Sequence, residues 1–199
     1  MKTLLCAASV IAALLAPAAH ATPILQDAVI SATYNGAADA MLGLDHLYAQ
    51  EAGSNVTHID ADDNPFNPEF LSGDYLFAVD ISTAGAITVY NNGPVPAGAY
   101  RMTLDFGNSL GKAITGFSLF DNSLASGIPG LTLLNGHAVG IDLGGIGWPS
   151  GANGGADYAS FSGQLSFDAP SAVPVPQTAL LLLTGLAALA GVRRPARKA

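Results

Sequence analysis

The chain is poor in basic residues and has almost no cysteine. Its 199 residues include seven lysines and arginines, fifteen aspartates and glutamates, and one cysteine. That residue, Cys6, lies in the apolar stretch at the N-terminus, so the remainder of the chain has no thiol. Disulfide bonds, thiolate zinc sites and cysteine nucleophiles are therefore excluded there. A domain without such links is held together by burial, for which about 150 residues suffice.

The few basic residues are distributed very unevenly. Residues 22–172 contain two basic and fifteen acidic side chains, a formal charge of −13, whereas residues 193–199 contain four basic side chains and no acidic one. A domain this acidic lacks the cationic surface that neutralises phosphates, so we expect no nucleic-acid partner. Solubility and attraction of divalent cations are the expected consequences of its charge.

The N-terminus has the three parts of a secretory signal peptide. Lys2 supplies a positive charge, residues 4–17 form an apolar stretch, and Ala19 and Ala21 are the small residues before a cleavage site. We expect residues 1–21 to form a signal helix that is removed before Thr22. The alternatives are an uncleaved anchor and a buried helix, but the apolar stretch is short for a membrane span.

The C-terminus, residues 173–199, combines a proline motif, an apolar run and a basic end. The run over 179–192 is almost wholly apolar, and residues 193–199 are basic. A helix over residues 176–192 has about 17 residues and is about 25 Å long, at the short end for a transmembrane span. Because basic residues stay on the cytoplasmic side, we expect the preceding domain to lie outside the inner membrane. The residues that define these parts are Val173, Pro174, Val175, Pro176, Arg193 and Arg194.

This layout resembles a PEP-CTERM sorting tail over about the last 27 residues of the chain. The family has a Val-Pro-Glu-Pro motif, and Val175 stands where its glutamate is usual. The resemblance implies processing by an exosortase, a membrane enzyme of Gram-negative bacteria that make exopolysaccharide. It also implies inner-membrane anchoring with the domain in the periplasm before processing, then a cell-surface or extracellular location, with exopolysaccharide as a partner. The alternative is a plain membrane anchor.

The domain between the ends, residues 22–172, is expected to be all-β. Alternation such as Met102 and Leu104 against Arg101 and Thr103 predicts strands with one buried face. Four Asn-Gly pairs, at residues 35–36, 92–93, 135–136 and 153–154, favour tight reversals between antiparallel strands. One helix is predicted over residues 39–52. The pattern predicts an antiparallel, jelly-roll-like β-sandwich with strands at 28–34, 75–81, 86–90, 99–106, 114–120, 131–134, 138–143 and 158–167.

An acidic loop is the candidate metal site. Asp60, Asp62 and Asn64 alternate in the manner of the first ligands of a calcium loop. Pro65 and Leu71 occupy the sixth and twelfth positions, which excludes an EF-hand. A looser calcium site, with Glu69 or Asp74 as a further ligand, is one interpretation, and a solvated acidic loop is the other. The histidines at positions 46, 58 and 137 show no paired ligand spacing.

Two further motifs bear on activity. Residues 107–111 match the Gly-x-Ser-x-Gly pattern of a nucleophile elbow, which needs a following helix and then an acid and a histidine in that order. Residue 114 onward is predicted to be a strand and His137 precedes Asp142, so we expect a glycine-rich hairpin turn and no enzyme. Trp148 is a candidate platform for a sugar, with a core anchor as the alternative. The sequence thus predicts a non-enzymatic surface protein without a cofactor, or alternatively a carbohydrate- or calcium-binding module.

Overall fold

The computed structural model describes residues 23–60, 67–149 and 159–168. Over these ranges the protein is all-β, its strands pair antiparallel, and a 3-10 turn, η1 (Leu44–His46), is the only helical element. The predicted signal peptide with Ala19, Ala21 and Thr22, and the predicted tail with its membrane helix, lie outside them. Among the described residues, no helix has the length and hydropathy that crossing a bilayer requires.

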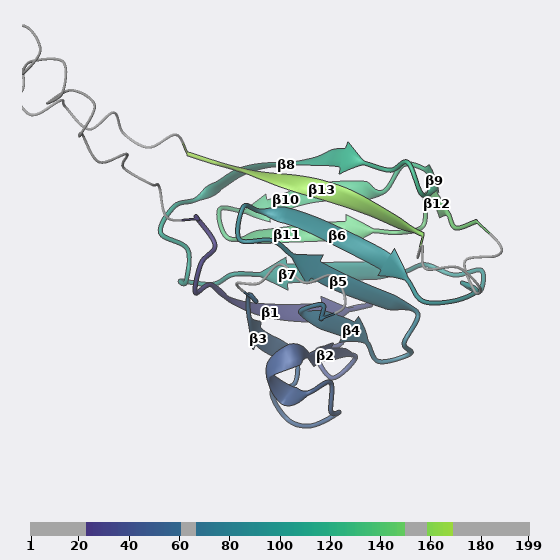
Figure 1. Cartoon of the computed structure of the whole chain (residues 1–199), viewed down its shortest axis with the longest axis horizontal. Coiled ribbons are helices and arrows are strands. Elements are labelled where there is room, and N and C mark those ends of the chain that lie inside the picture. The colour runs from purple at the N-terminus through teal and green to yellow at the C-terminus, as the bar shows by residue number, and fades with distance from the viewer. Residues whose placement is uncertain (1–22, 61–66, 150–158, 169–199) are drawn as a thin grey trace, which may run out of the picture. The chain divides into compact units, whose positions relative to one another are not determined.

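Two sheets contain nearly all the strands (Figure 1). The five-stranded sheet has the order β10-β11-β7-β1-β3, and the six-stranded sheet has the order β2-β4-β5-β6-β13-β8. The first sheet comprises β1 (Val29–Tyr34), β3 (Val56–His58), β7 (Arg101–Asp105), β10 (Gly130–Asn135) and β11 (Ala138–Asp142). The second comprises β2 (Met41–Gly43), β4 (Phe70–Ser72), β5 (Phe77–Ile81), β6 (Ala86–Asn91), β8 (Ile114–Asp121) and β13 (Ser160–Phe167). A separate ribbon pairs β9 (Ser126–Gly127) with β12 (Ile146–Gly147).

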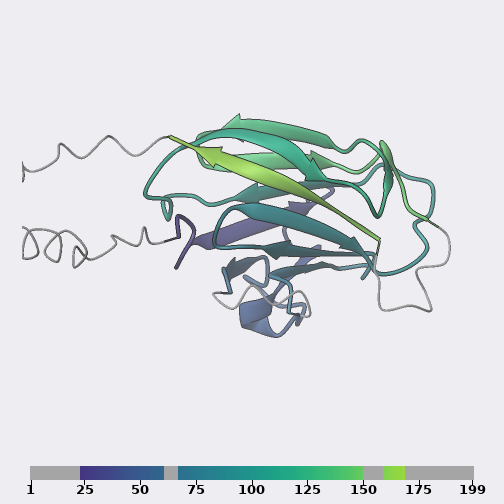
Figure 2. The ribbon, with the colours of Figure 1, turned by 45° about the horizontal axis from the view of Figure 1, so that its top comes forward.

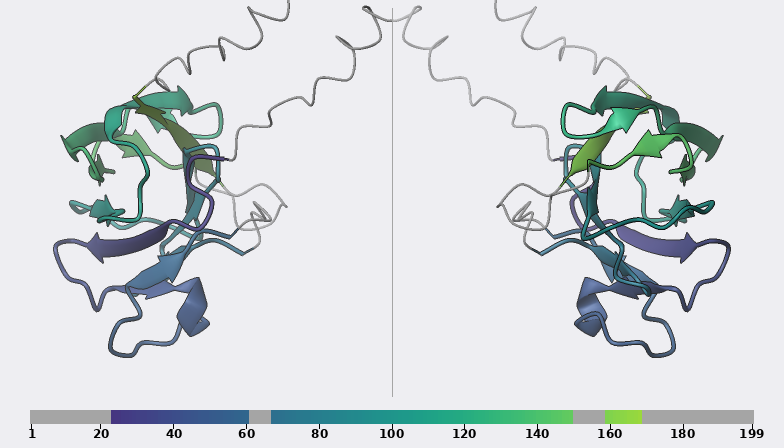
Figure 3. Two further views of the ribbon diagram at one scale, coloured as in Figure 1. Left: turned by 90° about the vertical axis from the view of Figure 1, so that its left-hand side faces the viewer. Right: turned by 90° about the vertical axis from the view of Figure 1, so that its right-hand side faces the viewer.

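The two sheets share one hydrophobic core. Seen along the strands, they lie on either side of the interior (Figure 3). Alternation supplies the core side chains, because Met102 and Leu104 of β7 are buried while Arg101 is exposed. Both sheets contribute large, fully buried residues, including Ile30, Leu104, Phe70, Phe77, Phe161 and Ile87. This arrangement is consistent with a β-sandwich.

Two of the Asn-Gly predictions are confirmed. Asn35 and Gly36 have φ values of 51° and 82° and reverse the chain between Tyr34 and Ala37, which pair with each other. Residues 135–136 open the reversal from β10 to β11. The pair at 92–93 instead leads from β6 into a crossing to β7 of the other sheet, and the pair at 153–154 lies outside the described residues.

The helix predicted over residues 39–52 is wrong. Met41 to Gly43 form β2, which pairs with β4, and only η1 follows. Gly43 explains part of the difference, because a Cβ there would lie 2.7 Å from the Ser54 carbonyl oxygen. Close packing against β3 and pairing with β4 therefore override the helical periodicity of this segment.

The strand directions give the domain two distinct ends. The start of β1 at Val29 and the end of β13 at Phe167 lie at one end (Figures 1 and 2). The ends of β6 at Asn91 and β11 at Asp142 lie at the opposite end, as does the start of β7. The loops that follow β6 and β11 therefore lie at the end of the domain opposite to the end of β13.

Candidate functional site

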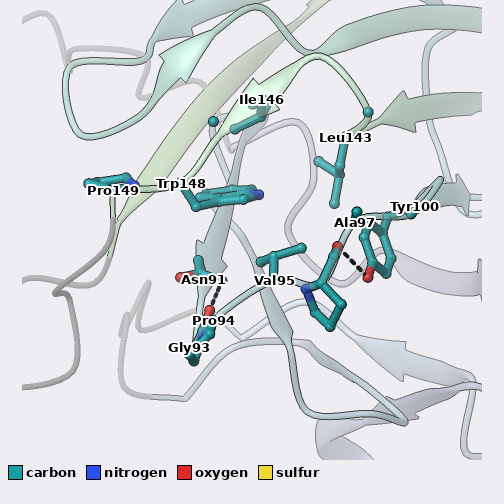
Figure 4. A pocket seen from close by; sticks show the side chains of 14 residues that line it. Asn91, Gly93, Pro94, Val95, Ala97, Tyr100, Leu143, Ile146, Trp148 and Pro149 are labelled. Carbon is teal, nitrogen blue, oxygen red and sulfur yellow. Dashed lines mark hydrogen bonds between the residues drawn. The ribbon is translucent and has the colours of Figure 1, made fainter.

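A pocket of about 590 Å³ lies at the end where β6 and β11 finish. Two loops line it, one from β6 to β7 and one that follows β11, and they are about 50 residues apart in sequence. Among the residues that the structure describes, fourteen line the pocket, and none of these is charged. Figure 4 shows the side chains that give the pocket its shape, with Val95 placed between the two aromatic rings: Asn91, Val95, Tyr100, Leu143, Ile146 and Trp148.

The first loop is tied to the strands on both sides of it. The Asn91 side-chain amide donates to the Gly93 carbonyl at 2.6 Å, and the Tyr100 hydroxyl donates to the Pro96 carbonyl at 2.9 Å (Figure 4). Pro94 and Pro96 additionally fix φ within the loop. These hydrogen bonds and prolines restrict the conformations that the loop can adopt before a ligand binds.

The aromatic residues of the pocket are anchored from behind. The Trp148 ring lies 5.7 Å from Phe77 and 6.2 Å from Phe161, between ring centroids. Tyr100 stacks on Tyr34 at 6.3 Å with an interplanar angle of 11°, and meets Phe77 edge-on at 5.5 Å. Trp148 therefore packs against the core, and it also lines the pocket.

The carboxylate that precedes the second loop is already engaged. Asp142 accepts the Gly144 backbone N–H at 2.9 Å and pairs with the Arg101 guanidinium at 2.9 Å. The backbone hydrogen bond from Gly144, followed by the Arg101 hydrogen bond, lowers the pKa of Asp142 below its usual value. Both side chains of this ion pair are exposed, so it contributes little to the stability of the fold.

The predicted calcium site is described only in part. Asp62 and Asn64 lie outside the described residues, and Asp60 accepts a hydrogen bond from the Asn67 side chain at 3.3 Å. Over the described ranges, no group of three or more acidic or histidine side chains is placed to hold a metal ion. Asp74, considered as a further ligand, accepts hydrogen bonds from Tyr34 and Ser72. The calcium site stays a prediction.

Glu69 is a buried carboxylate that the sequence offers only as a surface ligand. Its side chain is 1% exposed, and its two oxygens accept the backbone N–H groups of Asp60 at 2.9 Å and Ile81 at 2.6 Å. Burial raises its pKa to about 7, and the charge of Asp80 adds to the rise, although both N–H donors oppose it. Glu69 therefore ties the acidic loop and the end of β5 to β4.

Each described histidine pairs with a carboxylate through Nδ1. His46 contacts Glu51 at 2.7 Å, His58 contacts Asp45 at 2.7 Å, and His137 contacts Asp105 at 2.8 Å. Partial burial is the largest single influence on the pKa of Asp105 and raises it, but the hydrogen bonds from the His137 side chain and the Gly107 backbone N–H, together with the charge of His137, lower that pKa below its usual value. The pairing of His137 follows from strand register, because Ala138 lies opposite Asp105.

The Gly-x-Ser-x-Gly match forms a turn, but the predicted hairpin is wrong, because β7 and β8 belong to different sheets and the chain crosses from one to the other. Gly107 has a φ of 52° at the end of β7, and the chain then continues into β8, a strand. The Ser109 hydroxyl lies 2.6 Å from the Phe106 carbonyl oxygen and 3.0 Å from that of Val29. A hydroxyl held by backbone carbonyls is not presented to a base as a nucleophile elbow requires.

Comparisons of the chain with protein-family models, with curated proteins and with solved structures find no match.

Proposed function

We propose that this chain is an exported, non-enzymatic cell-surface or extracellular-matrix protein, delivered by its C-terminal tail and built as a jelly-roll-like β-sandwich. The observation that carries the proposal is the order of the segments. One topology, with the domain outside the inner membrane and the basic end on the cytoplasmic side, is predicted by all three segments. These are the signal-like residues 1–21, the acidic domain, and the apolar tail followed by Arg193 and Arg194. The tail follows the PEP-CTERM layout, so an exosortase is the proposed processing enzyme.

The domain itself is proposed to act by binding. Calcium and carbohydrate are the two ligands that the sequence leaves open. The pocket favours the second, because it combines two aromatic rings with an uncharged lining and a tethered loop. The described lining has no carboxylate, the group around which calcium sites in proteins are usually built. Calcium binding therefore rests on the Asp60 loop alone.

Replacing Pro174 and Pro176 together with alanine should block removal of the tail. We expect the double variant to keep its full mass and to stay with the inner membrane, because the proline motif is the part of the tail that the sorting enzyme is proposed to read. Mass spectrometry and cell fractionation of the producing bacterium provide the measurement. Pro170→Ala, just before the motif, is the matched control and should be processed normally. Unchanged processing of the double variant would count against sorting.

A further inference from the structure

We propose that the pocket formed by residues 91–100 and 143–149 binds an uncharged saccharide, with Trp148 as the stacking surface. The inference rests on the proposed binding role of the domain and specifies the ligand class and its site. Three features of the pocket support it: the described lining carries no charge, the lining combines aromatic rings with polar backbone groups, and hydrogen bonds hold the first loop.

The charge of the domain and of the pocket lining favours a neutral saccharide over an acidic one. Within the described part of the chain, no charged residue lines the pocket, although residues 22–172 carry a formal charge of −13. An acidic saccharide would meet repulsion from the domain and find no Arg or Lys in the lining to pair with its carboxylates. Arg101, which lies beside the pocket in sequence, is paired with Asp142. A neutral saccharide meets neither obstacle.

The lining matches both surfaces of a sugar ring. A pyranose has an apolar C–H face, which packs on an aromatic ring, and hydroxyl groups that need donors and acceptors at its edge. Trp148 and Tyr100 supply aromatic rings for the apolar face of the sugar, and the backbone of the two loops supplies polar groups for its hydroxyls. Gly93 leaves that backbone accessible, since a Cβ placed there would have no atom within 4 Å.

The hydrogen bonds that hold the first loop reduce the conformational entropy that ligand binding would cost. The loop is held at Gly93 by Asn91 and at Pro96 by Tyr100, while Trp148 rests on Phe77 and Phe161. Rigid pockets of this kind lose little conformational entropy when a ligand enters. The pocket's lining residues lie where β6 and β11 end, and Figure 1 shows that β13 ends on the opposite side of the sheets.

The protein contains its own probe, because Trp148 is its single tryptophan. The full-length chain, in a detergent without a sugar head group, is titrated with neutral gluco- and manno-oligosaccharides while its tryptophan emission is recorded. Oligogalacturonate and a proline-rich peptide are titrated in parallel. We expect a saturable change in emission with a neutral series and none with the other two.

Two variants test the site by calorimetry. Trp148→Ala should weaken saccharide binding by about tenfold or more, as loss of a central aromatic contact does. Tyr100→Phe keeps the ring but removes the tether to Pro96, so it tests the site even if Trp148→Ala fails to fold. Phe120→Ala is the control, since Phe120 is 73% exposed and does not line the pocket.

Each outcome decides the inference. A response to oligogalacturonate or the peptide alone would overturn the ligand class, and saccharide binding that survives both pocket variants would overturn the site. Absence of any emission change and any heat would overturn the inference as a whole. The delivery part of the proposed function stands or falls separately, on the Pro174 and Pro176 experiment.

Discussion

Replacing Phe77 with alanine is expected to cost about 3–5 kcal/mol of unfolding free energy. Phe77 is fully buried on β5 and contacts the rings of Tyr34, Tyr100 and Trp148 at centroid distances of 6.2, 5.5 and 5.7 Å. Its removal leaves a cavity beneath three aromatic rings that cannot all move to fill it. Domains of this size are stable by about 5–15 kcal/mol, so the variant should be close to unfolding.

Urea unfolding followed by Trp148 emission measures this loss directly. The folded variant should also emit at longer wavelength than the natural protein, because Trp148 loses one of the two rings that hold it against the core. Phe120→Ala is the control, and at 73% exposure it should change stability by no more than about 0.5 kcal/mol. A Phe77→Ala loss below about 1 kcal/mol would contradict the described core.

Stability should decrease as the pH rises from about 4.5 to about 7, and Glu69 should be the cause. Its pKa is raised from 4.5 to about 7 in the folded protein, chiefly by burial. Below pH 4.5 the carboxyl is protonated in both states. As the pH rises toward 7, the unfolded chain releases its proton while the folded chain keeps it, so about 3 kcal/mol of stability is lost.

The comparison of two glutamine variants isolates this effect. Glu69→Gln cannot titrate, so its unfolding free energy should lose this pH dependence. The variant should also be less stable overall, because an amide nitrogen replaces one of the two oxygens that accept the Asp60 and Ile81 N–H groups. Glu51→Gln is the matched control on an exposed glutamate. Urea midpoints between pH 4 and 8 provide the data. An unchanged slope in Glu69→Gln would show that another group is responsible.

Periodicity predicted the strands that have one face against the core. The segments at 99–106 and 158–167 contain β7 and β13, whose alternating apolar residues Met102, Leu104, Phe161 and Leu165 are buried. The three-residue strands β2, β3 and β4 were not predicted, because so short a segment carries no period. Their pairing depends on contacts such as that between Gly43 and Ser54, which are set by the folded chain.

The pocket was only half visible in the sequence. Trp148 stood out as a lone aromatic in a glycine-rich segment, but its partner loop lies about 50 residues earlier. β6 and β11 belong to different sheets, and only the packing of the two sheets brings the end of β6 beside the loop that follows β11. Glu69 was read as a surface ligand because a carboxylate gives no sequence signal of burial, whereas its two N–H donors appear only in the fold.

The central claim is that the C-terminal tail is a sorting signal that is cleaved off after export. The intact mass of the protein isolated from the surface or medium of the producing bacterium tests it most directly. We predict a chain that begins at Thr22 and has lost everything after the motif formed by Val173, Pro174, Val175 and Pro176. A mature protein that still ends at Ala199 would contradict the account and identify the tail as a plain membrane anchor.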